Sequence, residues 1–159
     1  MPRSRYSEEE AVQKPAGELL CRELGWDVVY CYDEEKLGED GTLGRINYEQ
    51  VILERYLAPA LLELNEWLEE DEVPGVVSTL KSSLATDTLL QTNEKKYDML
   101  RDGIPVERVR PDGSTYEERA RVFDFEHPEM NSFLACEELI VKSPFYTRRC
   151  DSRLRERNP

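Results

Sequence analysis

The chain has 159 residues, which suits a single domain large enough to bury a core without disulfides or metal. Hydrophobic residues make up 39% and charged residues 35%, with a net charge of −13, so the apolar content is too high for a disordered chain. No apolar run is long enough to cross a bilayer, and the first residues lack a secretory signal. These features predict a cytoplasmic protein with no membrane partner.

The first predicted helix covers residues 7–24. Ser7 and Glu10 form a capping-box pattern, although Pro15 favours a helix that begins there, with proline in its first turn. Gly25 is placed to end the helix. The 3.6-residue spacing predicts that one apolar face is buried, formed by Val12, Ala16, Leu19, Leu20 and Leu24.

A strand is predicted over residues 26–32, because the segment is aromatic and β-branched. Residues 33–45 combine glycines with charges and are predicted to form a flexible, exposed loop. A long helix follows over residues 48–70, which Pro59 should kink or restart. A weaker helix, rich in Ser and Thr, is expected over residues 76–90.

The second half of the chain is predicted to be mainly strands. After a short helix over residues 94–102, strands at 104–110 and 118–125 flank the turn signal Pro111-Asp112-Gly113. They should form a half-exposed antiparallel hairpin. A last strand is predicted over residues 134–142.

The charge is unevenly distributed along the chain. Residues 1–80 carry a net charge of −12, and residues 81–159 carry −1. Since cationic side chains attract phosphate, contact with nucleic acid should concentrate near the C-terminal end. The candidate DNA-binding residues are Lys142, Arg148, Arg149, Arg153 and Arg155. The alternative is a solvated basic tail without a partner.

The cysteines and the single histidine do not form a pattern typical of a metal site. No two cysteines are spaced as zinc ligands, and a catalytic cysteine would have to use a histidine in a turn-like segment before proline. We therefore expect free thiols and a solvent-facing histidine; the residues are Cys21, Cys31, Cys136, Cys150 and His127.

Five segments in this order resemble the N-terminal region of the restriction (R) subunit of type I restriction-modification enzymes. Val12-Gln-Lys-Pro-Ala16, leading to Leu24-Gly-Trp26, is similar to the family's first helix and first strand. The later segments are Leu53–Asn65; Leu100-Arg-Asp-Gly-Ile-Pro-Val106; Val122–Phe133; and Arg148-Arg-Cys-Asp151, which is similar to the family's Arg-Arg-Pro-Asp. The resemblance covers nearly the whole chain.

This resemblance implies an α/β fold, a restriction-endonuclease-like (PD-(D/E)-x-K) domain with a mixed sheet flanked by helices. It implies DNA as substrate, Mg²⁺ and ATP as cofactors, and the methyltransferase and specificity subunits of a type I complex as partners. In such a site carboxylates hold Mg²⁺ beside a phosphate, and a lysine stabilises the developing charge.

Two departures from the family pattern concern the metal site. Asp151 matches the family's aspartate, but no Glu-x-Lys follows it in this sequence. The family's first-helix glutamate is replaced by Gln13, which brings no charge to a metal. For both residues the simpler interpretation is a solvent-exposed side chain.

These departures predict a truncated, incomplete nuclease domain over residues 1–151, followed by a divergent basic tail over residues 152–159. We expect the chain to be inactive alone, because the Glu-x-Lys and the helicase domains are missing. One alternative is a non-catalytic docking or regulatory module that binds restriction-modification subunits or DNA. Another is an active Mg²⁺ nuclease completed by dimerisation, so enzymatic activity stays open.

Overall fold

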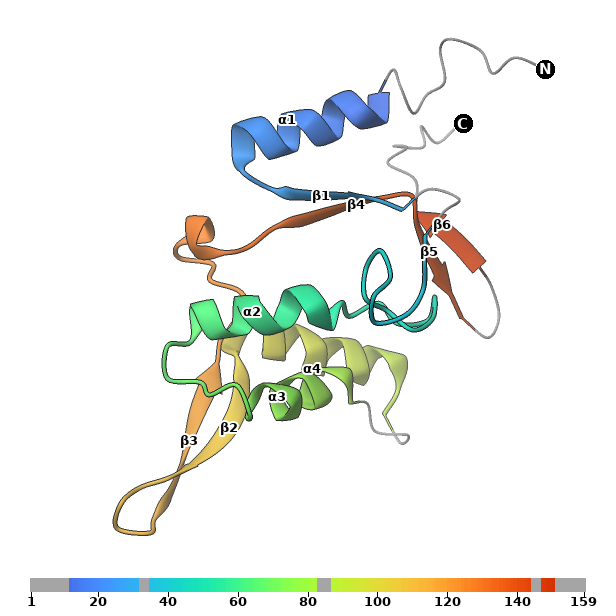
Figure 1. The fold of residues 1–159 in the computed structure, drawn as a ribbon. Coiled ribbons are helices and arrows are strands. Elements are labelled where there is room, and N and C mark those ends of the chain that lie inside the picture. The colour runs from blue at the N-terminus through green and yellow to red at the C-terminus, as the bar shows by residue number, and fades with distance from the viewer. Residues whose placement is uncertain (1–11, 32–34, 83–86, 144–146, 151–159) are drawn as a thin grey trace, which may run out of the picture. The chain divides into compact units, whose positions relative to one another are not determined.

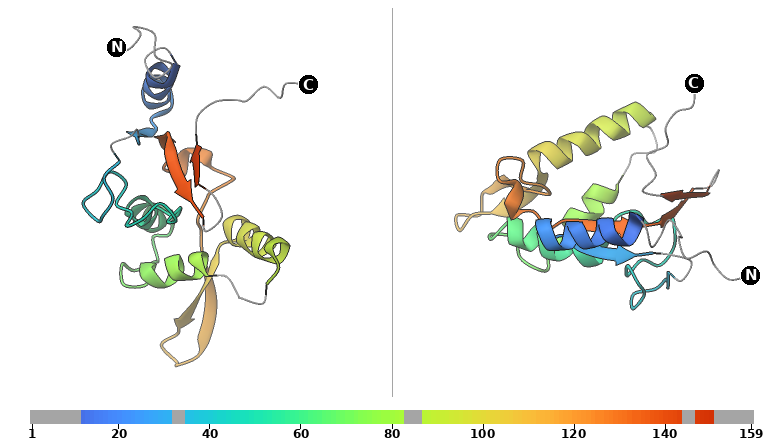
Figure 2. Two further views of the ribbon diagram at one scale, coloured as in Figure 1. Left: turned by 90° about the vertical axis from the view of Figure 1, so that its right-hand side faces the viewer. Right: turned by 90° about the horizontal axis from the view of Figure 1, so that it is seen from above.

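A computed structural model describes residues 12–31, 35–82, 87–143 and 147–150. The chain separates into two compact units. The first unit contains residues 1–53 and 132–159, and the second contains residues 54–131. Figures 1 and 2 show the helices and strands of each unit from three directions.

The first unit is built around two short strand pairs. β1 (Asp27–Tyr30) pairs in parallel with β4 (Leu134–Glu137), and helix α1 (Lys14–Leu24) packs on this pair (Figure 1). β5 (Leu139–Lys142) pairs antiparallel with β6 (Thr147–Cys150). The strand predicted over residues 134–142 is therefore two strands, and β6 was not predicted.

Helix α1 begins near Pro15, which was one of its two predicted starts. It ends at Gly25, as predicted. Residues 1–11, including Ser7 and Glu10, lie outside the described residues. The predicted buried face is wrong, since Val12, Leu19 and Leu24 are all more than half exposed. The helix instead buries Gln13 and Gly17, one turn apart.

Gly17 explains why α1 turns this face to the strands. A Cβ at this position would lie 2.8 Å from the Tyr30 hydroxyl oxygen, 3.0 Å from Glu137 Oε1 and 3.1 Å from a Val28 methyl carbon. Glycine therefore allows a close approach of helix to strands that a larger residue would prevent.

The segment predicted as an exposed loop, residues 33–45, has enclosed side chains near both ends of its described part, residues 35–45. The side chains of Glu35 and Arg45 are 1% and 0% exposed and form an ion pair at 2.6 Å. Leu43 is also fully buried. The prediction was wrong here because the glycines signal turns without showing which of the intervening side chains face inward.

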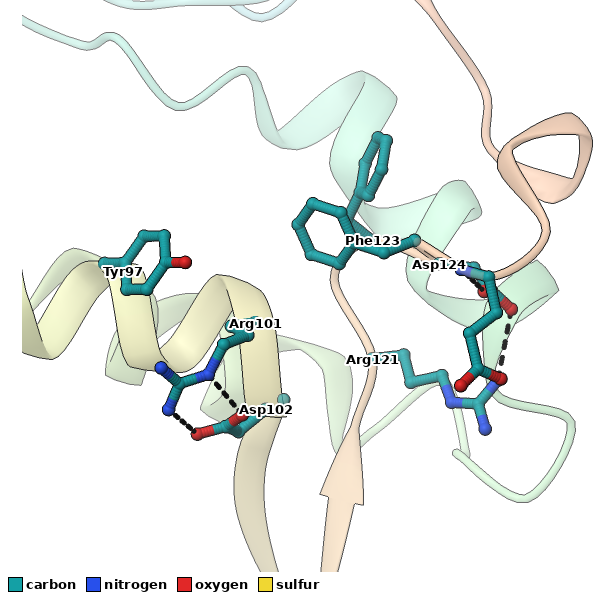
Figure 3. A pocket seen from close by; sticks show the side chains of 9 residues that line it. Tyr97, Arg101, Asp102, Arg121, Phe123 and Asp124 are labelled. Atoms are coloured by element: carbon teal, nitrogen blue, oxygen red, sulfur yellow. Dashed lines mark hydrogen bonds and ion pairs between the residues drawn. The ribbon is translucent and has the colours of Figure 1, made fainter.

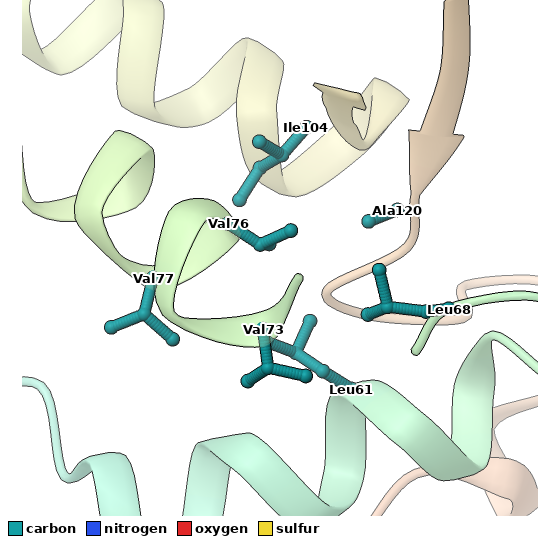
Figure 4. Close-up of a cluster of buried hydrophobic side chains, with 7 residues drawn as sticks. All are labelled: Leu61, Leu68, Val73, Val76, Val77, Ile104 and Ala120. Atoms are coloured by element: carbon teal, nitrogen blue, oxygen red, sulfur yellow. The ribbon is translucent and has the colours of Figure 1, made fainter. Parts of the chain in front are cut away.

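In its described residues the second unit contains three helices, a hairpin and a single turn of 3-10 helix. Its elements are α2 (Glu54–Leu64), α3 (Val73–Lys81), α4 (Leu89–Asp102), β2 (Ile104–Val109), β3 (Thr115–Ala120) and η2 (Pro128–Met130). Their apolar side chains form one core, shown in Figure 4, from Leu61, Leu68, Val73, Val76, Val77, Ile104 and Ala120.

The predicted hairpin is confirmed, because β2 and β3 pair antiparallel around the turn that contains Gly113, but its second strand covers residues 115–120 and not 118–125. The helix boundaries differ from those predicted. α2 is shorter than residues 48–70, and Pro59, where a kink or a restart was predicted, lies inside this single helix. α4 begins at Leu89 rather than residue 94, because Thr88 and Gln91 form a capping box that the predicted boundary did not take into account.

The described elements make an α/β protein, as expected, but not one mixed sheet. They form three two-stranded sheets, one parallel and two antiparallel. Within the described part of the chain, no helix is both long enough and apolar enough to cross a membrane.

Candidate functional site

Gln13 is buried, with 3% of its surface exposed, and not solvent-facing as the simpler interpretation supposed. It occupies the N-cap position of α1, and its Nε2 donates a hydrogen bond to Glu138 Oε1 at 3.1 Å. The partners are 125 residues apart in sequence. The structure thus joins the start of α1 to the junction of β4 and β5.

Glu138 is a site residue that sequence reasoning missed. It lies between the end of β4 at Glu137 and the start of β5 at Leu139, with a positive φ of 59°. A signal was available, because two consecutive glutamates interrupt an otherwise apolar strand. The pattern could not show which of them contacts Gln13.

The predicted metal ligand Asp151 lies outside the described residues, as do Arg153 and Arg155. The described pairing of β5 with β6 ends at Cys150, which pairs with Leu139 and directly precedes Asp151. The structure therefore does not test whether these three side chains approach Gln13.

Lys142 and Arg148 are brought onto neighbouring strands, and both side chains are exposed. Lys142 Nζ lies 4.6 Å from the centroid of the Tyr48 ring, and its backbone N–H donates to the Tyr48 carbonyl oxygen at 2.9 Å. In the ladder Arg148 pairs with Val141, and Arg149 pairs with Ile140. The β5–β6 hairpin thus gathers three of the five predicted DNA-binding positions.

Arg45 ties this hairpin to the preceding loop. Its guanidinium donates to the Ile140 carbonyl oxygen at 2.8 Å and lies 5.3 Å from the Tyr48 ring centroid. The hydrogen bond to Glu35 raises the pKa of Arg45, so the buried group stays charged. The buried guanidinium of Arg45 is therefore hydrogen-bonded to the backbone of β5.

The fit of a divalent cation can be judged from the donor atoms present. Among the described residues, no three His, Cys, Asp or Glu side chains gather closely enough to hold a metal ion. The Gln13–Glu138 pair does offer oxygen donors, the type that Mg²⁺ prefers, and Mg²⁺ is often held by one or two carboxylates plus water and phosphate oxygens. One carboxylate and one amide alone do not make such a site.

The second unit has an open pocket of about 500 Å³, lined among others by Tyr97, Phe123 and two arginine–aspartate pairs (Figure 3). Arg101 contacts Asp102 at 2.5 Å, and Arg121 contacts Asp124 at 3.1 Å. Because each of these cations already has a carboxylate partner, the pocket does not present the uncompensated positive charge that phosphate binding favours.

Fold and site together define an α/β module in which a buried amide, Gln13, is hydrogen-bonded to a half-buried carboxylate, Glu138, beside a basic hairpin. The chain belongs to the family described as type I restriction enzyme R protein N terminus (HSDR_N), whose model matches residues 5–156. It is 32% identical over 120 residues to the type I restriction enzyme HindI endonuclease subunit of Haemophilus influenzae. That match covers 76% of this chain and 11% of the relative. No solved structure matches the chain.

Proposed function

We propose that this chain is the nuclease-type module of a type I restriction enzyme R subunit, with a restriction-endonuclease-like fold, acting on DNA in the cytoplasm. The observation that carries the proposal is the burial of residue 13 against the β4–β5 junction. From the family resemblance we expect a metal-site residue at this position, and the burial of Gln13 argues against a merely solvated helix residue.

In this proposal Asp151, which follows β6 directly, is the aspartate ligand of the metal site. Mg²⁺, when bound, would polarise a scissile phosphate. The sequence contains no lysine after Asp151 to stabilise the developing charge. The 159-residue chain by itself is therefore proposed to be inactive as a nuclease.

A plasmid-nicking assay with Mg²⁺ tests that part of the proposal. The wild-type chain and Asp151→Ala should both leave supercoiled plasmid intact. Nicking by the wild-type chain that Asp151→Ala abolishes would contradict inactivity and support a nuclease completed by dimerisation.

The basic hairpin is proposed to contact the DNA backbone through Lys142, Arg148 and Arg149, and the sequence adds Arg153 and Arg155 as further candidates. Each cation that neutralises a phosphate of double-stranded DNA contributes about 0.9 to the slope of log K against log salt. Lys142→Ala/Arg148→Ala should therefore weaken binding to duplex DNA and lower that slope by about 1.8.

Lys95→Ala/Arg119→Ala is the matched control, since it removes the same charge from exposed positions of the second unit. Binding should be measured by fluorescence anisotropy over a range of salt concentrations. An equal loss in both double variants would mean that the contact depends on net charge alone and would contradict a hairpin interface.

A docking or regulatory role is the second candidate function, favoured by the net charge of −12 on residues 1–80. Acidic residues of this region would bind a basic surface of the methyltransferase or specificity subunits, with salt-sensitive association. Co-purification with a type I methyltransferase–specificity complex at low salt would support it. A complex that forms equally well at high salt, or none at all, would count against it.

A further inference from the structure

Two cysteines of the first unit, Cys31 and Cys136, are brought together by the parallel pairing of β1 with β4. Cys136 lies in β4 and pairs with Val29 of β1. Cys31 directly follows β1, and its backbone N–H donates to the Glu137 carbonyl oxygen at 2.9 Å. Side chains alternate between the two faces of a strand, so both thiols lie on the face that carries Val29.

This face of the strand pair points away from α1. The helix packs on the opposite face, where a Cβ at Gly17 would lie 2.8 Å from the Tyr30 hydroxyl oxygen. The face that carries the thiols is close to the buried Glu35–Arg45 ion pair, because both charges act on both cysteines. The two thiols therefore lie beside an enclosed cation, the surroundings that favour a thiolate.

The two thiols are free, as expected, and their surroundings differ. A hydrogen bond from Cys31 lowers the pKa of Cys136, and the positive charge of Arg45 lowers it further. The same hydrogen bond, together with burial, raises the pKa of Cys31. Cys31 is fully enclosed, whereas Cys136 is only half-buried. Cys136 is therefore the more acidic and more accessible thiol, and Cys31 is its protonated neighbour.

We propose that Cys136 and Cys31 form an oxidation site, at which hydrogen peroxide converts the two thiols into an intramolecular disulfide. The Cys136 sulfur attacks one peroxide oxygen, the O–O bond breaks, and a sulfenic acid and one water are formed. The Cys31 sulfur then displaces the sulfenic hydroxyl group, which leaves as a second water with the Cys31 proton. An acidic, accessible cysteine beside a resolving cysteine is typical of redox sensors. The inference does not depend on the proposed nuclease or DNA-binding roles.

The strand pairing brings the two residues close to the separation that a disulfide requires. Neighbouring strands lie about 4.8 Å apart, and disulfides join Cα atoms about 4.4–6.8 Å apart. Cys31 lies two positions beyond Val29, the partner of Cys136, so the chain at Cys31 must move toward β4 to close the bond. Since β1 ends at Tyr30, this movement can leave the paired residues of the two strands in register.

Treatment of the full chain with hydrogen peroxide, followed by peptide mass spectrometry, tests the proposal. In Cys21→Ser/Cys150→Ser the pair supplies the only thiols. Peroxide should link the peptides of Cys31 and Cys136 within one chain, with the loss of two hydrogen atoms, and dithiothreitol should reverse the link. A disulfide between two chains, oxygen added to Cys136 while Cys31 stays free, or an unreacted pair would each overturn the proposal.

The assigned roles are tested by adding Cys31→Ser to the same variant, which should stop the reaction at a Cys136 sulfenic acid that dimedone traps. Adding Cys136→Ser should instead leave the enclosed Cys31 reduced, and oxidation of Cys31 in that protein would contradict its role as the resolving thiol.

The wild-type chain decides the matter if a variant fails to fold, because the exposed Cys21 is an internal control. Alkylation of the remaining thiols should show that Cys136 is oxidised at least tenfold faster than Cys21. Equal rates at the two positions would mean that the pair has no special reactivity, and the proposal would fail.

Discussion

Arg45 shows how a single buried side chain can control a loop. It is fully enclosed, pairs with Glu35 and donates to the backbone of β5. Removing one partner of a buried ion pair leaves an uncompensated charge, which is far more costly than losing an exposed pair.

Arg45→Met should therefore lower the free energy of unfolding by about 3–5 kcal/mol, measured by urea denaturation. The control is Arg22→Met, whose ion pair with Glu23 is exposed on both sides, with side chains 75% and 57% accessible. It should change stability by less than about 1 kcal/mol. Similar effects in the two variants would show that the Arg45 pair is not buried in solution.

Asp124 is the residue whose protonation should couple to folding of the second unit. Backbone N–H groups of His127 and Glu126 donate to its Oδ1 at 2.9 Å each, and these bonds hold its pKa below the ordinary value. A lowered folded-state pKa means that stability is present above the unfolded pKa, near 3.9, and is lost as pH falls through the folded pKa. His127 itself is mostly exposed, as predicted, and lies 3.6 Å from Asp124.

Asp124→Asn should therefore melt at a lower temperature than wild type at pH 7, and the difference should shrink as the pH falls below about 4. Melting temperatures between pH 7 and pH 2 would measure this. Asp98→Asn, at a half-exposed position on α4, should keep the wild-type profile. A constant difference at all pH values would argue against the proposed hydrogen-bond cause.

At the scale of elements, the packing of α1 on β1 and β4 depends on the absence of a side chain at residue 17. Alanine there would gain helix propensity but crowd Tyr30 and Glu137. A larger side chain would have to separate the helix from the strands, since inserting atoms into packed structure typically costs about 1–3 kcal/mol.

Gly17→Leu should accordingly destabilise the chain by about 1–3 kcal/mol in chemical denaturation. Gly75 in α3 offers a matched control, because a Cβ there would meet no atom within 4 Å. Gly75→Ala should stabilise by roughly 0.5–1 kcal/mol through helix propensity alone. A neutral Gly17→Leu would mean that α1 does not pack closely on the strands.

At the scale of the molecule, the two units differ in how the chain builds them. The second unit is one continuous segment, residues 54–131, with its own apolar core. The first needs segments from both ends of the chain, since β1 and β4 pair in parallel across the intervening residues.

A polypeptide of residues 54–131 should therefore fold alone and melt cooperatively, as followed by circular dichroism and by near-ultraviolet signals of Trp67. Native-like helix content without a cooperative transition would indicate a loosely packed state and would show that this unit depends on the rest of the chain.

The sequence by itself determined the family, the α/β class, the β2–β3 hairpin and the end of α1 at Gly25. These depend on local patterns: turn residues, capping glycines and motifs in a fixed order. It also identified Lys142 and Arg148 as candidate DNA-binding residues, because basic side chains can be recognised directly in the sequence.

Only the tertiary structure decided which side chains are enclosed and which distant residues meet. The apolar spacing of α1 predicted the wrong face, because a close approach at Gly17 outweighed the preference for burying leucines. The contact between Gln13 and Glu138, and the enclosure of Arg45, join segments far apart in sequence. Such contacts arise from the packing of whole elements, and no local pattern of residues specifies them.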